Sequence, residues 1–519
     1  MAITLQAQVE LVKDIFVGPS PSNPINLTYF NNHVYFVASY DTAKNALYKS
    51  DGTETGTSLF VDFSMGSHST FLYPYVYNNE LYFYGNSTTT GGGLTKTDGT
   101  TITTIANTNE NSIDLVNAFI EYNGLLYFSA NASFSESQQL FKTDGTTAGT
   151  VQVKSGLETS SLSDTRYGRA VYNGKLYFTG KDSNGKELWV TDGTEAGTVM
   201  VKDIRSNGSS DPHNFQVANG LLFFNARNDS DGRELWVSDG TEAGTQMVKD
   251  IYVGNSSNPH EMITYNNQLY FVANSAGSGE ELWTSDGTEA GTVMVKEIRS
   301  GSSGANPDEL ILFDNKIFFK ARDDDRGYEL WSSDGTEAGT QIVKDIFLGN
   351  DADANPRRLT LFNGELYFTA TTTEYGYELY KTNGTESGTV RLSDTWPDGG
   401  SLDPNRLAAG QQSLFFSGSD GVTGVEFYKY TDNATASVDE EALSSIRLYH
   451  SNGQLHLTSP NQEIVQIQLY TIQGKQVKTF SKGQILQDQM HITVSPGLYI
   501  ARLTSKDGKQ SSKKMLIHR

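Results

Sequence analysis

The stretch that decides the fold is residues 187–198, which read ELWVTDGTEAGT. Three near-copies follow it and begin at Glu234, Glu281 and Glu329, so the stretch recurs every 47 or 48 residues. Weaker copies keep the Asp-Gly-Thr element on both sides of this central block. A period of this length is typical of one four-stranded blade of a β-propeller. The repeat therefore predicts an all-β fold built from tandem blades.

Nine units can be counted from the Asp-Gly-Thr element. Its aspartate falls at Asp51, Asp98, Asp144, Asp192, Asp239, Asp286 and Asp334, is replaced by Asn383 in the eighth unit, and leaves only Asp432-Asn433-Ala434 in the ninth. The second and ninth units are degenerate. A nine-bladed propeller is the first interpretation, and an eight-bladed propeller with one irregular unit is the alternative.

Each unit reads as four strands. A pair of Asn or Gly residues, such as Asn219-Gly220, separates the first two strands. These residues tolerate the positive φ that a type I′ hairpin requires. The second strand, for example LYFVA at 269–273, is apolar nearly throughout, which predicts burial on both faces. The fourth strand, such as 247–251, is expected at the outer edge of its blade.

The two ends of the repeat region complement each other. Residues 11–15, LVKDI, match the fourth strand of a unit, such as MVKDI at 200–204, and the other three strands of that unit are missing before them. The ninth unit supplies 414–416 and 426–428 but no fourth strand. Pairing these ends would close the ring and remove exposed sheet edges. We therefore expect the N-terminal strand to complete the last blade.

The repeats resemble the family named for the Glu-Leu-Trp-x-x-Asp-Gly-Thr motif, found mainly in cell-surface proteins of Bacteroidota. The resemblance covers residues 9–434 and is most specific for the four central copies. It implies a repeat architecture and does not imply a particular ligand.

The pattern changes after residue 434. Residues 435–444 form a short polar linker, and short alternating strands separated by Gly-containing turns follow over 445–519. This pattern predicts a small antiparallel, Ig-like β-sandwich. The segment carries a net charge of +7, whereas the whole chain carries −22, so the remainder is strongly acidic at −29. Such an acidic body repels nucleic acids and anionic membranes.

The C-terminal segment resembles the type A sorting domain of the type IX secretion system. The matching residues are Asn452, Gly453, Gly474, Lys475, Pro496, Gly497, Leu498, Tyr499, Lys513 and Lys514. The Pro-Asn-Pro stretch usual ahead of the Asn-Gly pair is replaced by RLYH at 447–450. The resemblance implies export through the outer-membrane translocon and its shuttle components, with residues 445–519 as the signal. An ordinary accessory sandwich is the alternative.

Residues 1–8, MAITLQAQ, read as the remnant of a signal peptide, with a short frayed N-terminus as the alternative. The chain has no Cys, so disulfides and thiolate zinc sites are excluded. The sequence contains no apolar run of roughly 20 residues that would span a bilayer. The expected location is therefore extracellular, either secreted or on the cell surface.

Two sets of repeated residues invite a binding interpretation. The Asp of Asp-Gly-Thr could hold Ca²⁺, and Asp229, Asp231, Asp323 and Asp325 are weak further candidates, but an Asp at this position more often caps its own turn. The once-per-unit aromatics could stack on sugars, but a core between blades is the favoured role. They are Trp189, Trp236, Trp283 and Trp331, continued by Tyr48, Phe141, Tyr380 and Tyr428.

The sequence shows no His pair at zinc-binding spacing, no Gly-x-Ser-x-Gly elbow and no phosphate-binding loop. We therefore expect no catalytic residues, no cofactor and a protein that is not an enzyme. The leading hypothesis is a type IX cargo whose propeller binds a glycan or protein ligand in adhesion or gliding. The alternatives are a secreted hydrolase with carboxylates in the propeller channel and a structural spacer.

Overall fold

The structure is a computed structural model of the chain. It describes residues 8–42, 44–62, 72–87, 91–107, 113–132, 137–159, 168–349, 352–394, 396, 400–432, 447–451, 454–458, 464–471, 476–481, 485, 497–505 and 510–517. The chain separates into two compact units, Val9–Lys429 and a second unit that contains the residues from Tyr430 on. The predicted signal-peptide remnant, residues 1–8, lies outside the described residues except for its last position.

The first unit begins with β1 (Gln8–Lys13), which joins the last sheet of the unit. The sheets that follow come in chain order. They contain β2 (Ile25–Phe30), β3 (His33–Asp41), β4 (Lys44–Ser50) and β5 (Ser58–Asp62); β6 (Leu72–Tyr77), β7 (Glu80–Ser87), β8 (Gly91–Thr97) and β9 (Ile102–Asn107); and β10 (Asp114–Tyr122), β11 (Leu125–Asn131), β12 (Gln138–Thr143), β13 (Val151–Gln152), β14 (Glu158–Thr159), β15 (Arg169–Tyr172), β16 (Lys175–Asp182), β17 (Gly185–Thr191) and β18 (Val199–Lys202).

Five further sheets complete the first unit, each of four strands. They contain β19 (His213–Ala218), β20 (Leu221–Arg227), β21 (Arg233–Ser238) and β22 (Gln246–Lys249); β23 (His260–Tyr265), β24 (Gln268–Ser275), β25 (Gly279–Ser285) and β26 (Val293–Lys296); β27 (Asp308–Phe313), β28 (Lys316–Arg322), β29 (Tyr328–Ser333) and β30 (Gln341–Lys344); β31 (Arg357–Phe362), β32 (Glu365–Thr372), β33 (Gly376–Thr382) and β34 (Val390–Arg391); and β35 (Asn405–Ala409), β36 (Ser413–Ser419) and β37 (Val425–Thr431), which pair with β1.

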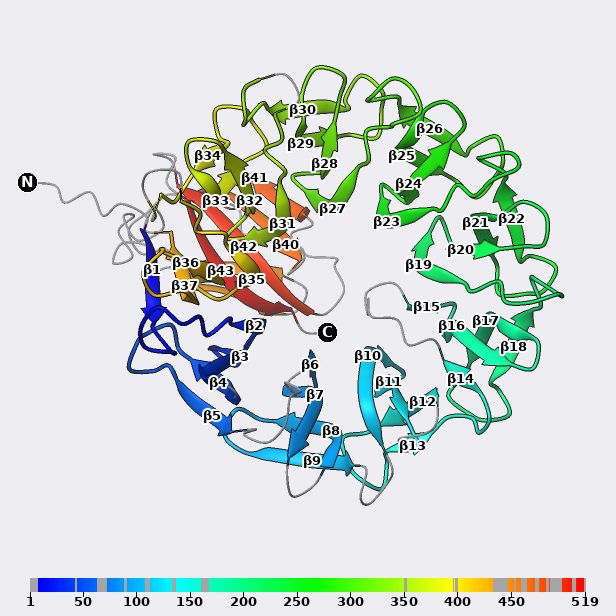
Figure 1. Cartoon of the computed structure of the whole chain (residues 1–519), viewed down its shortest axis with the longest axis horizontal. Coiled ribbons are helices and arrows are strands. Elements are labelled where there is room, and N and C mark those ends of the chain that lie inside the picture. Colours follow the sequence, from blue (N-terminus) through cyan, green and yellow to red (C-terminus); the bar gives the residue numbers. More distant parts are fainter. Residues whose placement is uncertain are drawn as a thin grey trace, which may run out of the picture. The chain divides into compact units, whose positions relative to one another are not determined.

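The sheets follow one another around a ring, with the first strand of each on the inner side (Figure 1). Most have four strands in chain order, as the repeat predicts. One difference is that β10 to β18 form a single nine-stranded sheet. The short strand β14 causes this, because Glu158 pairs with Gln139 of β12 and with Lys181 of β16.

The hairpins and the central strands form as predicted. Asn31 and Asn32 both have positive φ, at 46° and 61°, and other units place an Asn-Gly pair at the same turn. In β20 five successive residues are buried, and β16, β24 and β32 have the same pattern. These second strands form the core between neighbouring sheets because both of their faces are covered.

The first strands β19, β23, β27 and β31 each contain an irregularity that the sequence did not predict. The register of β23 against β24 shifts between His260 and Ile263, where Glu261 has a φ of 50°. The carboxylate of Glu261 accepts the amide of Leu310 in the next unit at 3.1 Å. This bulge therefore ties neighbouring inner strands together.

The Asp-Gly-Thr element is a side-chain-capped turn. Asp192 Oδ1 accepts the amide and the hydroxyl of Thr194 at 2.9 and 2.7 Å, and Thr194 Oγ1 accepts the amide of Gly197 at 2.9 Å. Gly193 has a φ of 94°, a conformation that suits glycine. These hydrogen bonds lower the pKa of Asp192. The repeated aspartate therefore fixes the connection between the third and fourth strands.

The repeated aromatics lie in the core. Trp189, Trp236, Trp283 and Trp331 are each only 6–7% exposed. Trp236 packs against Leu188 and Val201 of the preceding unit. A buried ring between two sheets cannot stack on a ligand, so these residues belong to the inter-blade core.

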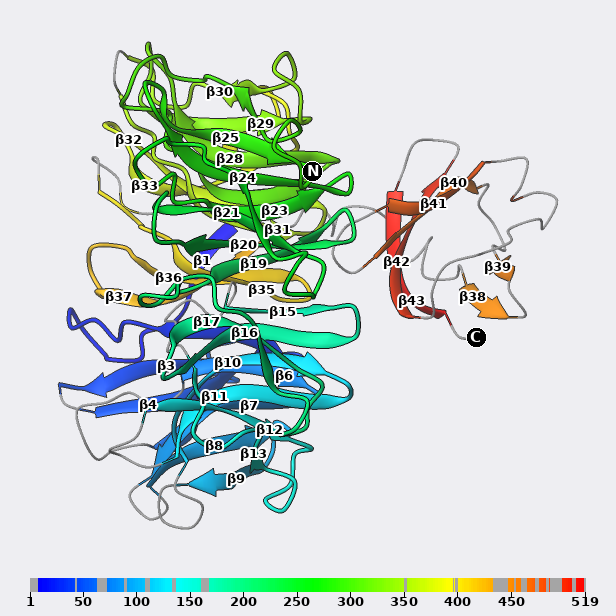
Figure 2. The ribbon, with the colours of Figure 1, turned by 90° about the vertical axis from the view of Figure 1, so that its right-hand side faces the viewer.

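The second unit contains β38 (Arg447–Ser451), β39 (Gln454–Thr458), β40 (Ile464–Thr471), β41 (Gln476–Ser481), β42 (Gly497–Ser505) and β43 (Gln510–Ile517). One antiparallel sheet has the order β41-β40-β42-β43, and β38 pairs with β39 in a separate hairpin (Figure 2). Ile467, Leu469 and Phe480 are fully buried in the larger sheet. The sequence predicted a small antiparallel, Ig-like β-sandwich in this region. The described strands form one four-stranded sheet and one hairpin.

Candidate functional site

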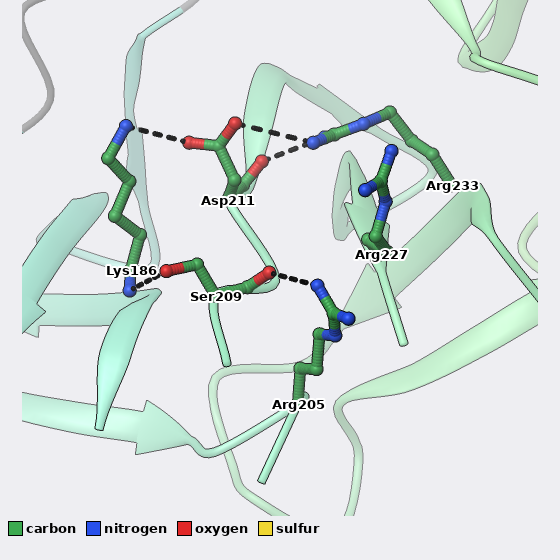
Figure 3. A pocket seen from close by; sticks show the side chains of 6 residues that line it. All are labelled: Lys186, Arg205, Ser209, Asp211, Arg227 and Arg233. Carbon is green, nitrogen blue, oxygen red and sulfur yellow. Dashed lines mark hydrogen bonds and ion pairs between the residues drawn. The ribbon is translucent and has the colours of Figure 1, made fainter. Parts of the chain in front are cut away.

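A cavity of about 360 Å³ lies where the unit of β15–β18 meets the sheet of β19–β22. Lys186 comes from β17, while Arg205, Ser209 and Asp211 come from the connection between β18 and β19. Arg227 ends β20 and Arg233 begins β21, and both also line the cavity. We call this cavity the basic pocket (Figure 3).

The basic pocket lies at one end of the strands. Antiparallel strands reverse direction at each turn, so the connections from second to third strand and from sheet to sheet share one end. We call it the loop end, because the Asn-Gly and Asp-Gly-Thr turns occupy the opposite end. Residues on this end belong to the loops of each blade and not to its repeated turns.

Asp211 is the central acceptor of the basic pocket. Its Oδ1 lies 3.3 Å from the ammonium of Lys186, and its Oδ2 lies 3.3 Å from the guanidinium of Arg233. Arg233 also donates to Asn225 at 2.9 Å and is 12% exposed, so packing holds it in place. Burial and the charge of Arg233 both lower the pKa of the adjacent His213.

Two further arginines leave the basic pocket with excess positive charge. The Nε of Arg205 lies 3.2 Å from Asp229, and its Nη1 donates to the carbonyl oxygen of Ser209. Arg227 is exposed, and its guanidinium has no hydrogen bond or ion pair among the described residues (Figure 3). Its charge contributes to lowering the pKa of Arg233, for which burial is the largest cause and which Asp211 opposes.

The backbone of the basic pocket is repeated around the propeller. The amide of Asp211 donates to the carbonyl of Lys186 at 3.0 Å. The same bond joins Asn258 to Arg233, Asn306 to Glu280, Asn355 to Tyr328 and Asp403 to Tyr377. The loop residue that donates its amide has a positive φ each time, 48° at Asp211 and 47° at Asn258, which Asn and Asp tolerate. The fold therefore requires the turn at this position, and a charge there is optional.

The side chains of the basic pocket are not repeated. One unit further on, the positions of Arg205, Arg227 and Arg233 hold Tyr252, Asn274 and Glu280. The basic pocket thus has four cations and one carboxylate, whereas the next space has one cation, Arg233, and one carboxylate, Glu280. The concentration of positive charge is a property of this one junction and not of the repeat.

A buried glutamate lies beneath each of these spaces. Glu187, the first residue of the Glu-Leu-Trp motif, is fully buried and accepts the amides of Ile204 and Ser210 at 2.9 and 3.0 Å. We call the six equivalent residues the clamp glutamates; they are Glu187, Glu234, Glu281, Glu329, Glu378 and Glu426. They hold the connection between one sheet and the next.

Burial raises the pKa of every clamp glutamate. The pKa rises to about 7 in Glu234, Glu281 and Glu378 and to about 8 in Glu329. Hydrogen bonds from backbone amides act in the opposite direction but are smaller. The sequence signal for this role was the unchanged glutamate in six successive copies. The sequence alone identifies this glutamate as part of a motif and does not mark it as a buried acceptor.

The weak calcium candidates are not brought together. Asp229 pairs with Arg205, and Asp231 accepts the hydroxyl of Ser230 at 2.7 Å. Asp323 pairs with Arg326, and the amide of Asp325 donates to Asp323. In the part of the chain that the structure describes, no three His, Cys, Asp or Glu side chains converge as metal ligands. Calcium binding by these residues stays a prediction.

The predicted sorting-signal residues are divided between described strands and positions outside the described residues. Asn452, Gly453, Gly474, Lys475 and Pro496 lie outside the described residues. Gly497, Leu498 and Tyr499 begin β42, where Tyr499 is 7% exposed, and Lys513 and Lys514 lie in β43. Because β42 pairs with β43, Ala501 and Ile500 are opposite these two lysines. The closing segment of the signal is therefore an edge strand of the larger sheet.

Residues 451–518 match the family model described as the secretion system C-terminal sorting domain. The search of curated proteins found no match.

Solved structures with a similar fold include enzymes. A puromycin hydrolase aligns with 80% of this chain and 61% of its own length, at 12% identity and a TM-score of 0.36. A prolyl endopeptidase aligns with 95% of this chain and 55% of its own, at 11% identity and a TM-score of 0.39. The propeller domain of the Trilobed protease from Pyrococcus furiosus aligns with 72% of this chain and 99% of its own, at 9% identity and a TM-score of 0.36. The chain spans about three fifths of the length of the puromycin hydrolase.

The expectation that the protein is not an enzyme is contradicted by these matches. The structures that align with this chain are described as a puromycin hydrolase and a prolyl endopeptidase. The expectation rested on missing motifs, and an active site assembled from separate loops leaves no contiguous motif. We withdraw it.

The sorting domain settles where the protein acts. A chain that carries the type IX C-terminal sorting domain is secreted and is located outside the cell or on its surface. Among the described residues, no helix is long and apolar enough to cross a membrane.

Proposed function

We propose that the protein is a type IX cargo whose propeller binds a ligand at the cell surface through its loop end. The basic pocket is the observation that carries this proposal, because its charges exceed what the repeat requires. We further propose that the translocon and its shuttle components recognise residues 445–519. The binding would serve adhesion or gliding.

We also propose that the propeller has nine blades and is closed by β1. Support comes from Glu426 of the last unit, which accepts the amides of Ile15 and Ser22 at 2.9 and 2.8 Å. Glu187 accepts the equivalent amides of the following unit in the same way. In addition, Lys429 donates to the carbonyl of Gly52 at 2.8 Å, as Lys49 donates to Gly99. The ends are thus joined by the bonds that join other neighbours.

Secretion is tested by removing residues 445–519 from the full chain in a host that has the type IX system. We expect the shortened protein to accumulate inside the cell, because the propeller lacks the signal. Western blots of cell, surface and medium fractions measure this. Normal surface delivery of the shortened protein would contradict the proposal.

Binding is tested with the secreted protein and intact cells. We expect purified protein to bind the surface of the producing cells and to release by competition with soluble surface material. A protein of unrelated fold with the same sorting domain is the control. Equal retention of that control would show that the propeller contributes nothing to binding.

A further inference from the structure

We propose that the basic pocket binds the carboxylate of an acidic sugar, either free or as one residue of a glycan. This inference rests on the proposed function, because it names the ligand class of the loop end. The cavity is lined by six polar residues and measures about 360 Å³. This volume is at the lower end of small-molecule sites, about 300–1,000 Å³, and suits a single sugar unit.

The charge balance favours an anion from outside the protein. Four cations and one carboxylate line the cavity, and Asp229 neutralises one more cation from beside it. These six charged groups therefore sum to a net charge of +2, and Arg227 is the cation among them that has no acidic partner among the described residues. Cations held close together repel one another, so an added anion stabilises them. Arg227 has the most direct role, because its guanidinium is exposed and has no described partner.

The donor geometry favours a carboxylate. A guanidinium presents paired N–H donors that match the two oxygens of a carboxylate. Arg227 lies beside Arg233, which Asp211 and Asn225 hold in place (Figure 3). A carboxylate in the pocket would contact Arg227 and leave the buried contacts of Arg233 intact. The polar Ser209 and Lys186 nearby offer hydrogen bonds to sugar hydroxyl groups.

The surrounding charge argues against a densely charged polymer. The chain outside residues 445–519 carries a net charge of −29, so a nucleic acid or other polyanion is repelled as it approaches. A ligand with one isolated negative charge reaches the basic pocket with less repulsion. An acidic sugar in a mainly neutral glycan has this charge density, as does a free sugar acid.

The test is a calorimetric titration of the full chain with glucuronate at low salt, with glucose as the neutral comparison. The variant is Arg227→Gln, and the matched control is Arg322→Gln, which changes the equivalent position two units further on. We expect glucuronate to bind and glucose not to bind. Arg227→Gln should weaken glucuronate binding at least about tenfold, because one charge-assisted pair is lost. Arg322→Gln should leave the affinity unchanged.

Two additional titrations separate the possible sources of the ligand. If an oligosaccharide that contains glucuronate binds more tightly than free glucuronate, the ligand is a glycan. If the two bind equally, the ligand is a free sugar acid. Competition by single-stranded DNA at equal concentration would overturn the inference. The inference would also be overturned if the Arg227→Gln variant and the natural chain bound glucuronate equally well, if glucose bound, or if glucuronate did not bind. If glucuronate fails while the protein still binds cells, the carboxylate inference falls and the proposed function stands.

Discussion

The basic pocket and the equivalent space one unit further along share a backbone but not their side chains. Both spaces have the same loop bond, Asp211 to Lys186 in one and Asn258 to Arg233 in the other. Both lie above a clamp glutamate, Glu187 or Glu234. The positions that Arg205, Arg227 and Arg233 hold in the basic pocket are held by Tyr252, Asn274 and Glu280 in the next space. The difference shows which residues the fold requires and which remain for a ligand.

The largest expected effect tests what the two spaces share. Glu187→Ala and Glu234→Ala should each lower the free energy of unfolding by about 3 kcal/mol, because buried amide and hydroxyl donors lose their acceptor. Urea unfolding measures the loss. The two values should agree within about 1 kcal/mol, since the repeated clamp is independent of the charge above it. A loss of stability in only one of the two variants would contradict the claim that both spaces rest on the same clamp.

The second effect concerns pH. Burial raises the pKa of Glu329 to about 8 and that of Glu234, Glu281 and Glu378 to about 7, above the ordinary glutamate value. The folded state then binds more protons than the unfolded state, so stability falls as the pH rises from about 5 to 8. Urea unfolding at several pH values checks this. Glu329→Gln cannot ionise and should make the decline shallower; an unchanged slope would contradict the raised pKa.

The third effect concerns the Asp-Gly-Thr turns, at the end of the strands opposite the loop end. Asp286→Ala should lower the free energy of unfolding by about 1 kcal/mol, because Asp286 accepts the amide and hydroxyl of Thr288 at 2.8 Å at an exposed site. Asp286→Asn is the control, since Asn383 makes the same bonds to Thr385 in the eighth unit. The asparagine variant should retain most of the stability. Equal losses in both variants would mean that the carboxylate charge, not the turn, matters.

The smallest effect on stability is expected at Arg227. Arg227→Gln should change the free energy of unfolding by less than about 0.5 kcal/mol, because the side chain is exposed and its guanidinium has no described partner. Thermal unfolding measures it alongside the Asn274→Gln variant in the next space. A loss above about 1 kcal/mol would assign Arg227 to the fold instead of to binding.

Repetition in the sequence predicted the fold better than the site. The period of the Glu-Leu-Trp motif, the Asn-Gly turns and the apolar second strands predicted the all-β sheets, because each is a local signal. The first-strand bulge at Glu261 was not predicted, because a positive φ at a glutamate leaves no compositional mark. The basic pocket was not predicted either. Lys186 and Arg227 are 41 positions apart, and only the packing of two sheets places them together.

The central claim is that departures from the repeat, and not the repeat itself, create the binding site. The most direct test builds a second basic pocket where Arg299 and Arg322 already occupy the positions of Arg205 and Arg227. The triple variant Glu280→Lys, Asn306→Asp and Tyr328→Arg completes the same set of charges there. We predict that calorimetry finds one glucuronate bound to the natural chain and two bound to the variant. A folded variant that still binds only one would contradict the claim.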